Sequence, residues 1–387
     1  MRPMIFRRTF YPVGQGAFYV EEFKLYDGSM FTIVYDCGST TLKIRGIEKE
    51  IERVFPKGHQ IDILFISHFH ADHINGINKL RKHCRIKEVI MPLINDKTEI
   101  IILQALNYIE TGIKNYNDLI ENPEKFFSEN DNGEWRTTIT RISPTNDEQE
   151  YGNNVLQSGK HLNHLKSFNW VFIPFNYKQN DWISFFKEKL EHEGISLEDI
   201  NKIINNETSD REYRQKIKIL KCVYTMLLDY GDLNKTSMIL YSGPQEDRSC
   251  YNFLSLQPAF SLFPRRSCLF DTFYNKEKTN YYGCLYTGDV NLTGIDIIID
   301  IESRLNKAGV LSYIGTLQIP HHGSKHNFDK SILYISNISY AIFSFGLGNT
   351  YGHPEYTVIK EVQNNNITPY LITEEIKTVV VQEGFLY

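Results

Sequence analysis

The sequence predicts an α/β layered domain, in which helices pack on β-sheets. Residues 5–35 alternate short aromatic and β-branched runs with turn signals, and Asp27-Gly28 between two such runs is a strong hairpin signal. The run IDILFIS at 61–67 has few polar residues, which is typical of a strand buried on both faces. A loop, a short helix at roughly 74–83 and the strand KEVIMP follow it, and this order of elements indicates an α/β layer.

The remaining elements fall into segments of different character. Before the buried strand, LKIRGIEKEIERVF predicts a charged helix. Between residues 92 and 232, ILQALNYIETGI, DWISFFKEKLEHE and REYRQKIKILKCVYTMLLDY place apolar residues at helical spacing. A strand is predicted at 236–242, and a long loop follows it at 243–280. Beyond the loop, strands are predicted at 284–290, 316–320, 340–346 and 368–374. We therefore expect one domain formed by 1–91 and 233–387, interrupted by a helix-rich insertion or cap at 92–232.

The composition of the 387-residue chain argues against several broad classes of protein. With 41% hydrophobic and 13% aromatic residues, the chain can form a packed core, so wholesale disorder is excluded. The net charge of −5 argues against a protein that coats nucleic acid through its overall charge. The six cysteines are scattered without a CxxC pair, which favours free thiols in a reducing compartment. Because we find no signal-peptide-like start and no run of about 18 apolar residues, we expect a cytoplasmic protein without a membrane segment.

The segment SHFHADH at 67–73 holds the densest cluster of potential metal ligands. In an extended loop alternate side chains point the same way, so His68 and His70 can reach one metal ion together. Asp72 and His73 lie where the chain turns into the predicted helix, and they can face a second ion beside the first. A polar loop that holds three histidines by chance is the alternative, but such a density of imidazole and carboxylate groups is costly unless they coordinate something. Two adjacent ions fit hydrolysis, because one activates water while both stabilise the developing oxyanion.

Two further segments place polar side chains at the ends of predicted strands. YTGD at 286–289 puts the carboxylate of Asp289 beside a glycine, where it could bridge two cations, although an aspartate after glycine is more often a turn residue. IPHHGS at 319–324 closes another strand with the histidine pair His321 and His322. Each segment is a weak signal alone, but together with SHFHADH they indicate one metal site.

These motifs carry a resemblance to a known superfamily. HFHADH matches the HxHxDH signature of the metallo-β-lactamase superfamily, and YDCG at 35–38 resembles its early strand-end Asp-x-Gly. Other motifs resemble the hydrolase domain of ComEC-type DNA-uptake proteins, namely VGQG at 13–16, NKTS at 234–237, YTGD, PHHGS and YGHPE at 351–355. The motifs have the family's order and leave out only 92–232 and the 243–280 loop. The resemblance implies an αββα sandwich of two mixed sheets with helices outside and the metal site at one edge.

The resemblance also implies two divalent metal ions, Zn²⁺ or Mn²⁺, and their ligands. His68 and His70 would bind one ion, Asp72 and His73 would bind the other, and Asp289 would bridge the two. The last ligand comes from PHHG at 320–323, where the family more usually has P-G-H-G. This alignment favours His322 as the ligand and places His321 beside the substrate or behind the ligands.

The environment of these ligands includes one departure from the superfamily. Many members have a further histidine on the first metal, but NKTS occupies that position here, as it does in the ComEC-like group. Asn234 or Ser237 could approach the metal instead, or a water could replace the ligand, and more oxygen ligands would suit Mn²⁺ as well as Zn²⁺. His161 and His164, from the insertion, are another possible source of the missing imidazole. Asp36, in YDCG, is expected to orient a ligand histidine, unless it is a plain turn residue.

The activity that the resemblance implies is hydrolysis by a metal-bound hydroxide. The best substrate class is a phosphodiester, with the enzyme acting as a phosphodiesterase or nuclease on single-stranded nucleic acid. Asp72 could orient the attacking water, His321 could contact the substrate and His353 could hydrogen-bond a phosphate, although His353 fits a locally satisfied loop histidine equally well. The loop that holds Arg265 and Arg266 among phenylalanines could bind a strand, or it could be a packed aromatic cluster with solvated arginines.

Two alternative functions use the same motifs. A small-molecule phosphoesterase, lactonase or thioesterase of the same fold would have a closed pocket roofed by the insertion. A catalytic or interaction subunit of a defence-type complex would bind a protein partner through 92–232. An open positive groove would favour nucleic acid, and a capped pocket would favour a small molecule.

Overall fold

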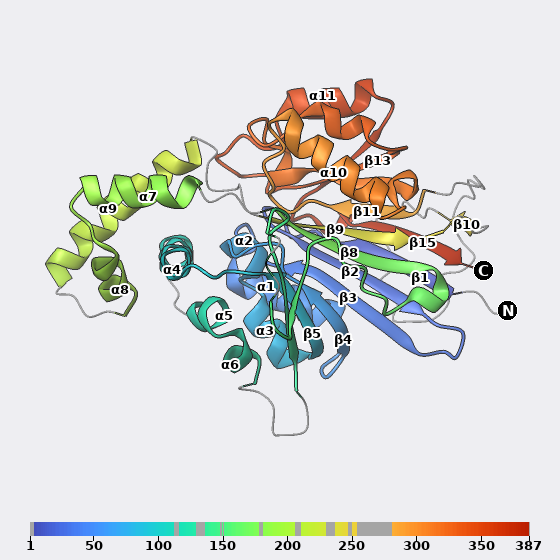
Figure 1. The fold of residues 1–387 in the computed structure, drawn as a ribbon, viewed down its shortest axis with the longest axis horizontal. Helices are drawn as coiled ribbons and strands as arrows, with labels where there is room; N and C mark the ends of the chain where they lie inside the picture. The colour runs from blue at the N-terminus through green and yellow to red at the C-terminus, as the bar shows by residue number, and fades with distance from the viewer. Residues whose placement is uncertain are drawn as a thin grey trace.

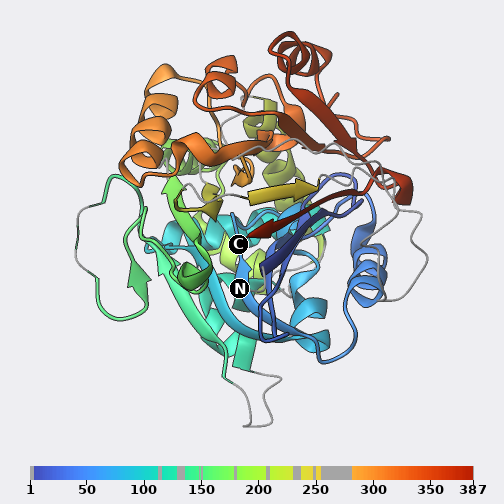
Figure 2. The ribbon, with the colours of Figure 1, turned by 90° about the vertical axis from the view of Figure 1, so that its right-hand side faces the viewer.

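The computed structural model describes residues 4–111, 116–128, 136–147, 149, 151–177, 181–205, 210–229, 237–246, 250–253 and 281–386. Two β-sheets lie face to face, and helices cover their outer sides (Figure 1). In Figure 2 both chain ends face the viewer, with the orange and red C-terminal helices above the sheets and the blue and cyan helices below them.

The first sheet is mixed and contains the predicted hairpin and the predicted buried strand. Within the described residues nine strands form it, in the order β10-β15-β1-β2-β3-β4-β5-β6-β7. Strands from β10 to β3 pair antiparallel, and strands from β3 to β7 pair parallel. Their bounds are β1 (Met4–Phe10), β2 (Phe18–Lys24), β3 (Met30–Cys37), β4 (Gln60–Phe65), β5 (Arg85–Pro92), β6 (Thr138–Ile142), β7 (Val155–Leu156), β10 (Cys250–Phe253) and β15 (Val380–Leu386).

The second sheet is also mixed and consists largely of the strands predicted in the last third of the chain. Six described strands form it, in the order β14-β13-β12-β11-β9-β8. The strands β11 to β14 pair parallel, whereas β9 is antiparallel to both of its neighbours. Their bounds are β8 (Trp170–Tyr177), β9 (Ser237–Pro244), β11 (Gly283–Tyr286), β12 (Ile314–Gln318), β13 (Tyr340–Ser344) and β14 (Thr368–Ile372).

Helices pack on the outer face of each sheet. On the first sheet, Ile47 and Ile51 of α1 (Lys43–Val54) are buried in one apolar cluster with Leu64 of β4. On the second sheet, Ile301 of α10 (Ile295–Lys307) and Val358 of α11 (Tyr356–Asn364) lie in another cluster with the strands beneath them. The short helices α2 (Ala71–Ile74) and α3 (Ile77–His83) follow β4, as expected. The layers are those of an αββα sandwich, so the predicted fold class is confirmed.

The space between the two sheets contains an aromatic core with one buried ion pair. Phe6, Phe23 and Trp170 pack between the sheets. Among these rings, the Nε of Arg8 donates to Glu21 over 2.6 Å, and both side chains are 1% exposed. Hydrogen bonds from residues of both sheets hold this ion pair in place.

The range 92–232, expected to be a helix-rich insertion or cap, contributes both helices and strands. It contains α4 (Lys97–Thr111), α5 (Asn117–Glu121), α6 (Pro123–Ser128), α7 (Asp181–His192), α8 (Leu197–Asn205) and α9 (Asp210–Asp229). The helices α7 to α9 extend from the side of the sandwich (Figure 1). The strands β6, β7 and β8 lie in the same range but belong to the two sheets, so the sandwich takes strands from inside the expected insertion. Strand β8 is an edge strand with Pro174 at its middle, which weakens its local signal.

The segments after residue 232 also differ from what was expected. Strand β10 lies within 243–280, which was expected to be a loop, and it pairs with β15, which was not predicted. Arg265 and Arg266 lie outside the described residues, and so does Asn234. Among the described helices, none has the length and apolar character that crossing a membrane requires.

Candidate metal centre

The candidate site forms where strands of both sheets end. Strands β3 and β4 are parallel neighbours in the first sheet, and β11 and β12 are parallel neighbours in the second. The ends of parallel strands meet at one edge of a sheet, so the residues after them come together. The polar side chains at this edge are Asp36, His68, His70, Asp72, His73, Asp289 and His322.

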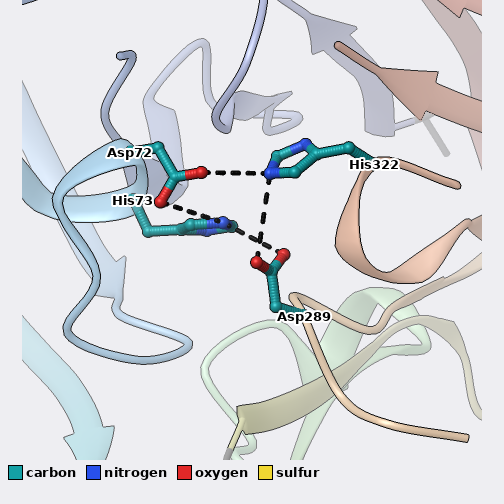
Figure 3. A group of neighbouring side chains, drawn as sticks. All are labelled: Asp72, His73, Asp289 and His322. Carbon is teal, nitrogen blue, oxygen red and sulfur yellow. Dashed lines mark hydrogen bonds and ion pairs between the residues drawn. The ribbon is translucent and has the colours of Figure 1, made fainter. Parts of the chain in front are cut away.

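Six of these side chains form two groups whose ligand atoms lie within 4.8 Å of one another. The first ligand group is His68, His70 and Asp289, and the second ligand group is Asp72, His73, Asp289 and His322. Figure 3 shows the second group, in which all four side chains point toward a common centre.

The distances within the groups show that Asp289 lies between them. Its Oδ1 lies 3.1 Å from Nε2 of His73, and its Oδ2 lies 3.8 Å from Nε2 of His68. Nε2 of His322 lies 3.0 Å from Oδ2 of Asp72 and 3.9 Å from Oδ2 of Asp289. The structure therefore brings the six predicted side chains together, with Asp289 between the other five.

The donor set fits divalent cations. Imidazole nitrogens and carboxylate oxygens are the ligands that Zn²⁺ and Mn²⁺ take in proteins. Nε2 of His68 is buried without a hydrogen-bond partner among the described residues, although a buried polar atom is normally paired. Asp289 is 2% exposed and His73 is 1% exposed, so water does not compensate for this clustering of polar atoms. A cation shared by these side chains would satisfy them.

Hydrogen bonds on the far side of three rings set their tautomers. Nδ1 of His73 lies 2.8 Å from Oδ2 of Asp36, and Nδ1 of His322 lies 2.7 Å from the carbonyl oxygen of Ser344. Ser67 Oγ donates to Oδ2 of Asp36 over 2.6 Å, so it accepts from Nδ1 of His68, 2.9 Å away. Each Nδ1 thus donates to a partner behind the ring, which leaves Nε2 as the nitrogen that faces the site. Asp36 therefore contacts the ring of His73, one of the predicted ligands, as its predicted orienting role requires.

Burial and neighbouring charges shift the pKa values of these groups in opposite directions. Burial, with help from His73, holds the pKa of His68 well below its ordinary value. Burial would also lower the pKa of His73, but Asp289, Asp72 and Asp36 together raise it well above its ordinary value. The pKa of Asp289 is well below its ordinary value, because the nearby histidines outweigh the effect of burial. The site therefore favours anionic carboxylates, which are the form that binds cations.

Two glycines allow the backbone of the HxHxDH loop to pack closely. A Cβ on Gly16 or on Gly38 would overlap the carbonyl oxygen of Asp72. The N–H of Ala17 donates to the same oxygen over 3.3 Å. The backbone of the motifs VGQG and YDCG thus packs directly against the backbone of Asp72 and His73. This requirement for space explains Gly16 and Gly38.

Residues from the range 92–232 hold the same loop from outside. Nδ2 of Asn107 on α4, which is 1% exposed, donates to the carbonyl oxygen of Phe69 over 2.5 Å. The hydroxyl of Tyr116 donates to the carbonyl oxygen of Asn75 over 2.9 Å. The loop that carries three of the ligand histidines is therefore bonded directly to this part of the chain.

The histidine pair occupies an unusual backbone conformation. His321 and His322 have φ values of 45° and 56° in the turn η4 (Pro320–Gly323), a region that non-glycine residues adopt rarely and at functional sites. His322 belongs to the second ligand group, whereas Nδ1 of His321 lies 2.8 Å from Oδ1 of Asn327. Nε2 of His321 lies 3.9 Å from Oδ2 of Asp289, so this ring flanks the centre.

His353 lies next to His321, with a distance of 5.3 Å between the ring centroids. Its Nδ1 is buried without a hydrogen-bond partner among the described residues. Burial, together with His321 and His322, lowers the pKa of His353 to about 3. His353 is thus a neutral ring beside the centre rather than a histidine satisfied within its own loop.

Other candidates lie apart from the ligand groups. His164 Nε2 contacts Oε2 of Glu88 at 3.1 Å, and His161 Nδ1 lies 3.4 Å from the amide of Gln245. Neither ring joins a ligand group, so the imidazole that the superfamily places on the first metal does not come from them. Ser237 Oγ accepts the N–H of Asp289 over 3.3 Å and so holds a ligand's backbone.

Three residues of the site were not singled out in the sequence. Ser67 and Ser344 contact the histidines described above, and Gln318 on β12 holds the loop before Asp289. The available signal is a polar residue in an otherwise apolar strand, because a buried polar group requires partners. That signal marks the residues but not their partners, which only the folded chain defines.

Comparisons with known proteins identify a superfamily to which part of the chain is similar. No curated protein matches the chain. Among solved structures, a long form of RNase Z from yeast matches 88% of this chain with 12% identity and a TM-score of 0.31, and the chain spans 37% of that protein. Residues 24–136, which include HFHADH, match the model of the metallo-β-lactamase superfamily. The chain thus has the αββα fold, and its residues 24–136 are similar to the metallo-β-lactamase superfamily.

Proposed function

We propose that the protein is a metal-dependent hydrolase that uses two divalent metal ions, Zn²⁺ or Mn²⁺. The first ligand group would hold one ion and the second ligand group the other. The observation that carries the proposal is that Asp289 belongs to both groups, so the two ions would be neighbours. Such a pair of ions activates water and stabilises the negative charge that develops during hydrolysis.

The residues beside the ligands have separate roles in this proposal. The side chains of Asp72 and His321 are 15% and 17% exposed, whereas that of Asp289 is 3% exposed. A substrate would therefore approach from the side of Asp72 and His321. Asp72 would orient the attacking water, and His321 with the neighbouring His353 would contact the group being cleaved.

The proposed substrate class is a phosphodiester, within single-stranded nucleic acid. The support is the likeness of VGQG, NKTS, PHHGS and YGHPE to the ComEC-type hydrolase domain, which is an argument by analogy. The physical support is that His321 and His353 place two imidazole rings beside Asp289, where they can hydrogen-bond phosphate oxygens.

Metal content and a substrate screen test this proposal together. The purified protein, His70→Ala and Asp72→Ala are analysed for bound metal and assayed on bis(p-nitrophenyl) phosphate, single-stranded DNA and RNA. His192→Ala is the control, because its side chain is 83% exposed and its ion-pair contact is with Glu193, outside the two ligand groups. We expect both site variants to lose metal and activity while remaining folded, and the control to keep both. Full metal occupancy in the two site variants would contradict the proposed ligands.

The same screen separates the nuclease from the small-molecule alternative. If the metal-loaded protein cleaves no nucleic acid but turns over a small phosphoester, a lactone or a thioester, the substrate class is wrong and the metal centre stands. Cleavage of single strands that falls steeply with salt supports the nuclease, since each phosphate contact releases counterions.

A further inference from the structure

Gln318 is a buried glutamine at the end of β12, two residues before the turn that contains the histidine pair. Its side-chain oxygen accepts the N–H groups of Thr287 and Gly288, each over 2.7 Å. Its side-chain nitrogen donates to the carbonyl oxygens of Gly288 over 3.0 Å and Ile319 over 2.7 Å. The two N–H donors fix which end of the amide is the oxygen. Gln318 is 5% exposed, so its side chain makes these hydrogen bonds in the protein interior.

The amide of Gln318 replaces backbone pairing where the sheet stops. Strands β11 and β12 pair as far as Leu285 and Leu317, and the loop with Asp289 begins just beyond. A primary amide offers the same acceptor and donor as a peptide group. The side chain therefore continues the connection between the two strands through Thr287 and Gly288. The hydroxyl of Thr287 adds a bond to the carbonyl oxygen of Gln318 over 2.8 Å.

The carbonyl oxygen of Gly288 is the point at which two ligand-bearing loops meet. It accepts from the side chain of Gln318 and also from the N–H of His321 over 3.2 Å. Gly288 has a φ of +55°, and a Cβ there would overlap Oγ of Ser237. The loop before Asp289 is thus fixed on one side by Gln318 and on the other by Ser237.

We propose that Gln318 is a positioning residue, which sets the place of Asp289 relative to His322 by bonding both loops through one side chain. This inference rests on the proposed function, because it assumes that Asp289 and His322 bind metal. Asp289 belongs to both ligand groups, so a shift of its loop disturbs both ions. Removing residues that orient metal ligands typically weakens metal affinity by about 10- to 100-fold.

The test compares Gln318→Met with Gln382→Met. Methionine has nearly the length and volume of glutamine but no amide. Gln382 on β15 is 4% exposed and is bonded to Arg8 and Thr316 rather than to the loops of the site. Metal affinity is measured by chelator competition, and the melting temperature is measured on the metal-free proteins. Both variants should have a lower melting temperature than the wild type. Only Gln318→Met should lose about 10- to 100-fold in affinity for Zn²⁺ or Mn²⁺.

The outcomes distinguish this inference from the proposed function. A wild-type protein that binds no divalent metal contradicts the proposed function itself. If the wild type binds metal, an affinity of Gln318→Met close to the wild-type value overturns the positioning role, and so does an equal loss in Gln382→Met. Should Gln318→Met not fold, Gln318→Asn, whose amide is one methylene too short to reach the loop, is judged by the same two criteria.

Discussion

At the scale of single residues, one carboxylate reaches both ligand groups. Asp36 accepts directly from His73 of the second group, and it accepts from Ser67, which in turn contacts His68 of the first group. Asp36 also accepts the N–H of Ser67 over 2.7 Å, so its two oxygens have three donors. The orientation of one ring in each group thus depends on a single side chain behind them.

This arrangement predicts unequal effects for Ser67→Ala and Asp36→Asn. The first change removes the acceptor of His68 but leaves His73 bonded to Asp36, so one metal equivalent should weaken by about 10- to 100-fold. The second replaces an accepting oxygen by a donating nitrogen, so both equivalents should weaken. Calorimetric titration with Zn²⁺ measures the two equivalents, and Ser242→Ala, a buried serine of the core, is the control. Equal weakening of both equivalents in Ser67→Ala would contradict the separate connections of Asp36 to His73 and, through Ser67, to His68.

The histidine pair gives a second prediction at this scale. His322 faces Asp72 and Asp289, whereas Nε2 of His321 is 3.9 Å from the nearest oxygen of Asp289. We expect His322→Ala to lose one metal equivalent, and His321→Ala to keep both and mainly to slow turnover. Elemental analysis of both variants measures this, and the reverse pattern would show that His321 is the ligand.

At the scale of elements, the HxHxDH loop depends on the backbone beneath it. Gly38 follows β3, and the space that a side chain would need there is filled by the backbone of Asp72 and His73. The φ of Gly38 lies outside the left-handed region, so the limit is space and not conformation. Gly152, by contrast, has no atom within 4 Å of the position of a Cβ.

Gly38→Ala should therefore destabilise the protein and displace the metal loop. Overpacking of this kind costs about 1–3 kcal/mol, and the displacement of Asp72 and His73 should also lower metal affinity. Gly152→Ala should change stability by less than about 0.5 kcal/mol and leave metal binding intact. Urea unfolding and metal titration of the two variants provide the comparison. If Gly38→Ala behaves like Gly152→Ala, the close packing is not required.

The elements also show how far the sequence could predict the structure. IDILFIS, the hairpin at Asp27-Gly28 and the strands after residue 236 have local patterns, and each forms a strand or turn near its expected place. Strand β8 was not predicted, because Pro174 in its middle weakens a local pattern that is otherwise typical of a strand. The HxHxDH motif indicated four site residues directly. The contacts of Gln318 could not be predicted, since its partners are backbone groups from another strand end.

At the scale of the whole molecule, the two sheets are joined by the network around Arg8 and Glu21. Arg8 on β1 donates to the carbonyl oxygens of Ser242 and Tyr282, each over 3.2 Å. Glu21 on β2 accepts from the hydroxyls of Ser242 over 2.5 Å and Tyr286 over 2.7 Å. These bonds cross from the first sheet to the second and its adjoining segment, within an otherwise aromatic core.

Removing one member of this network should cost far more than removing both. Arg8→Met leaves Glu21 as a buried charge without its partner, which typically destabilises a protein by about 3–5 kcal/mol. Arg8→Met combined with Glu21→Leu removes both charges and should recover most of that loss, because apolar replacements of a buried pair are often neutral. Urea unfolding of the single and double variants measures the difference. A double variant as unstable as Arg8→Met would contradict this account.

The bonds from Asn107 and Tyr116 to the loop of ligand histidines make that loop a shared boundary between the sandwich and the helices outside it. We therefore expect an ion that binds at the edge of the sandwich to stabilise the docking of α4, and by thermodynamic reciprocity a change that loosens α4 would then weaken the binding of the ion. Amide hydrogen exchange along α4 should therefore slow when metal is added, whereas exchange in α11, on the opposite face of the sandwich, should change less. The stability of α4 against local opening would thereby depend on whether metal is bound.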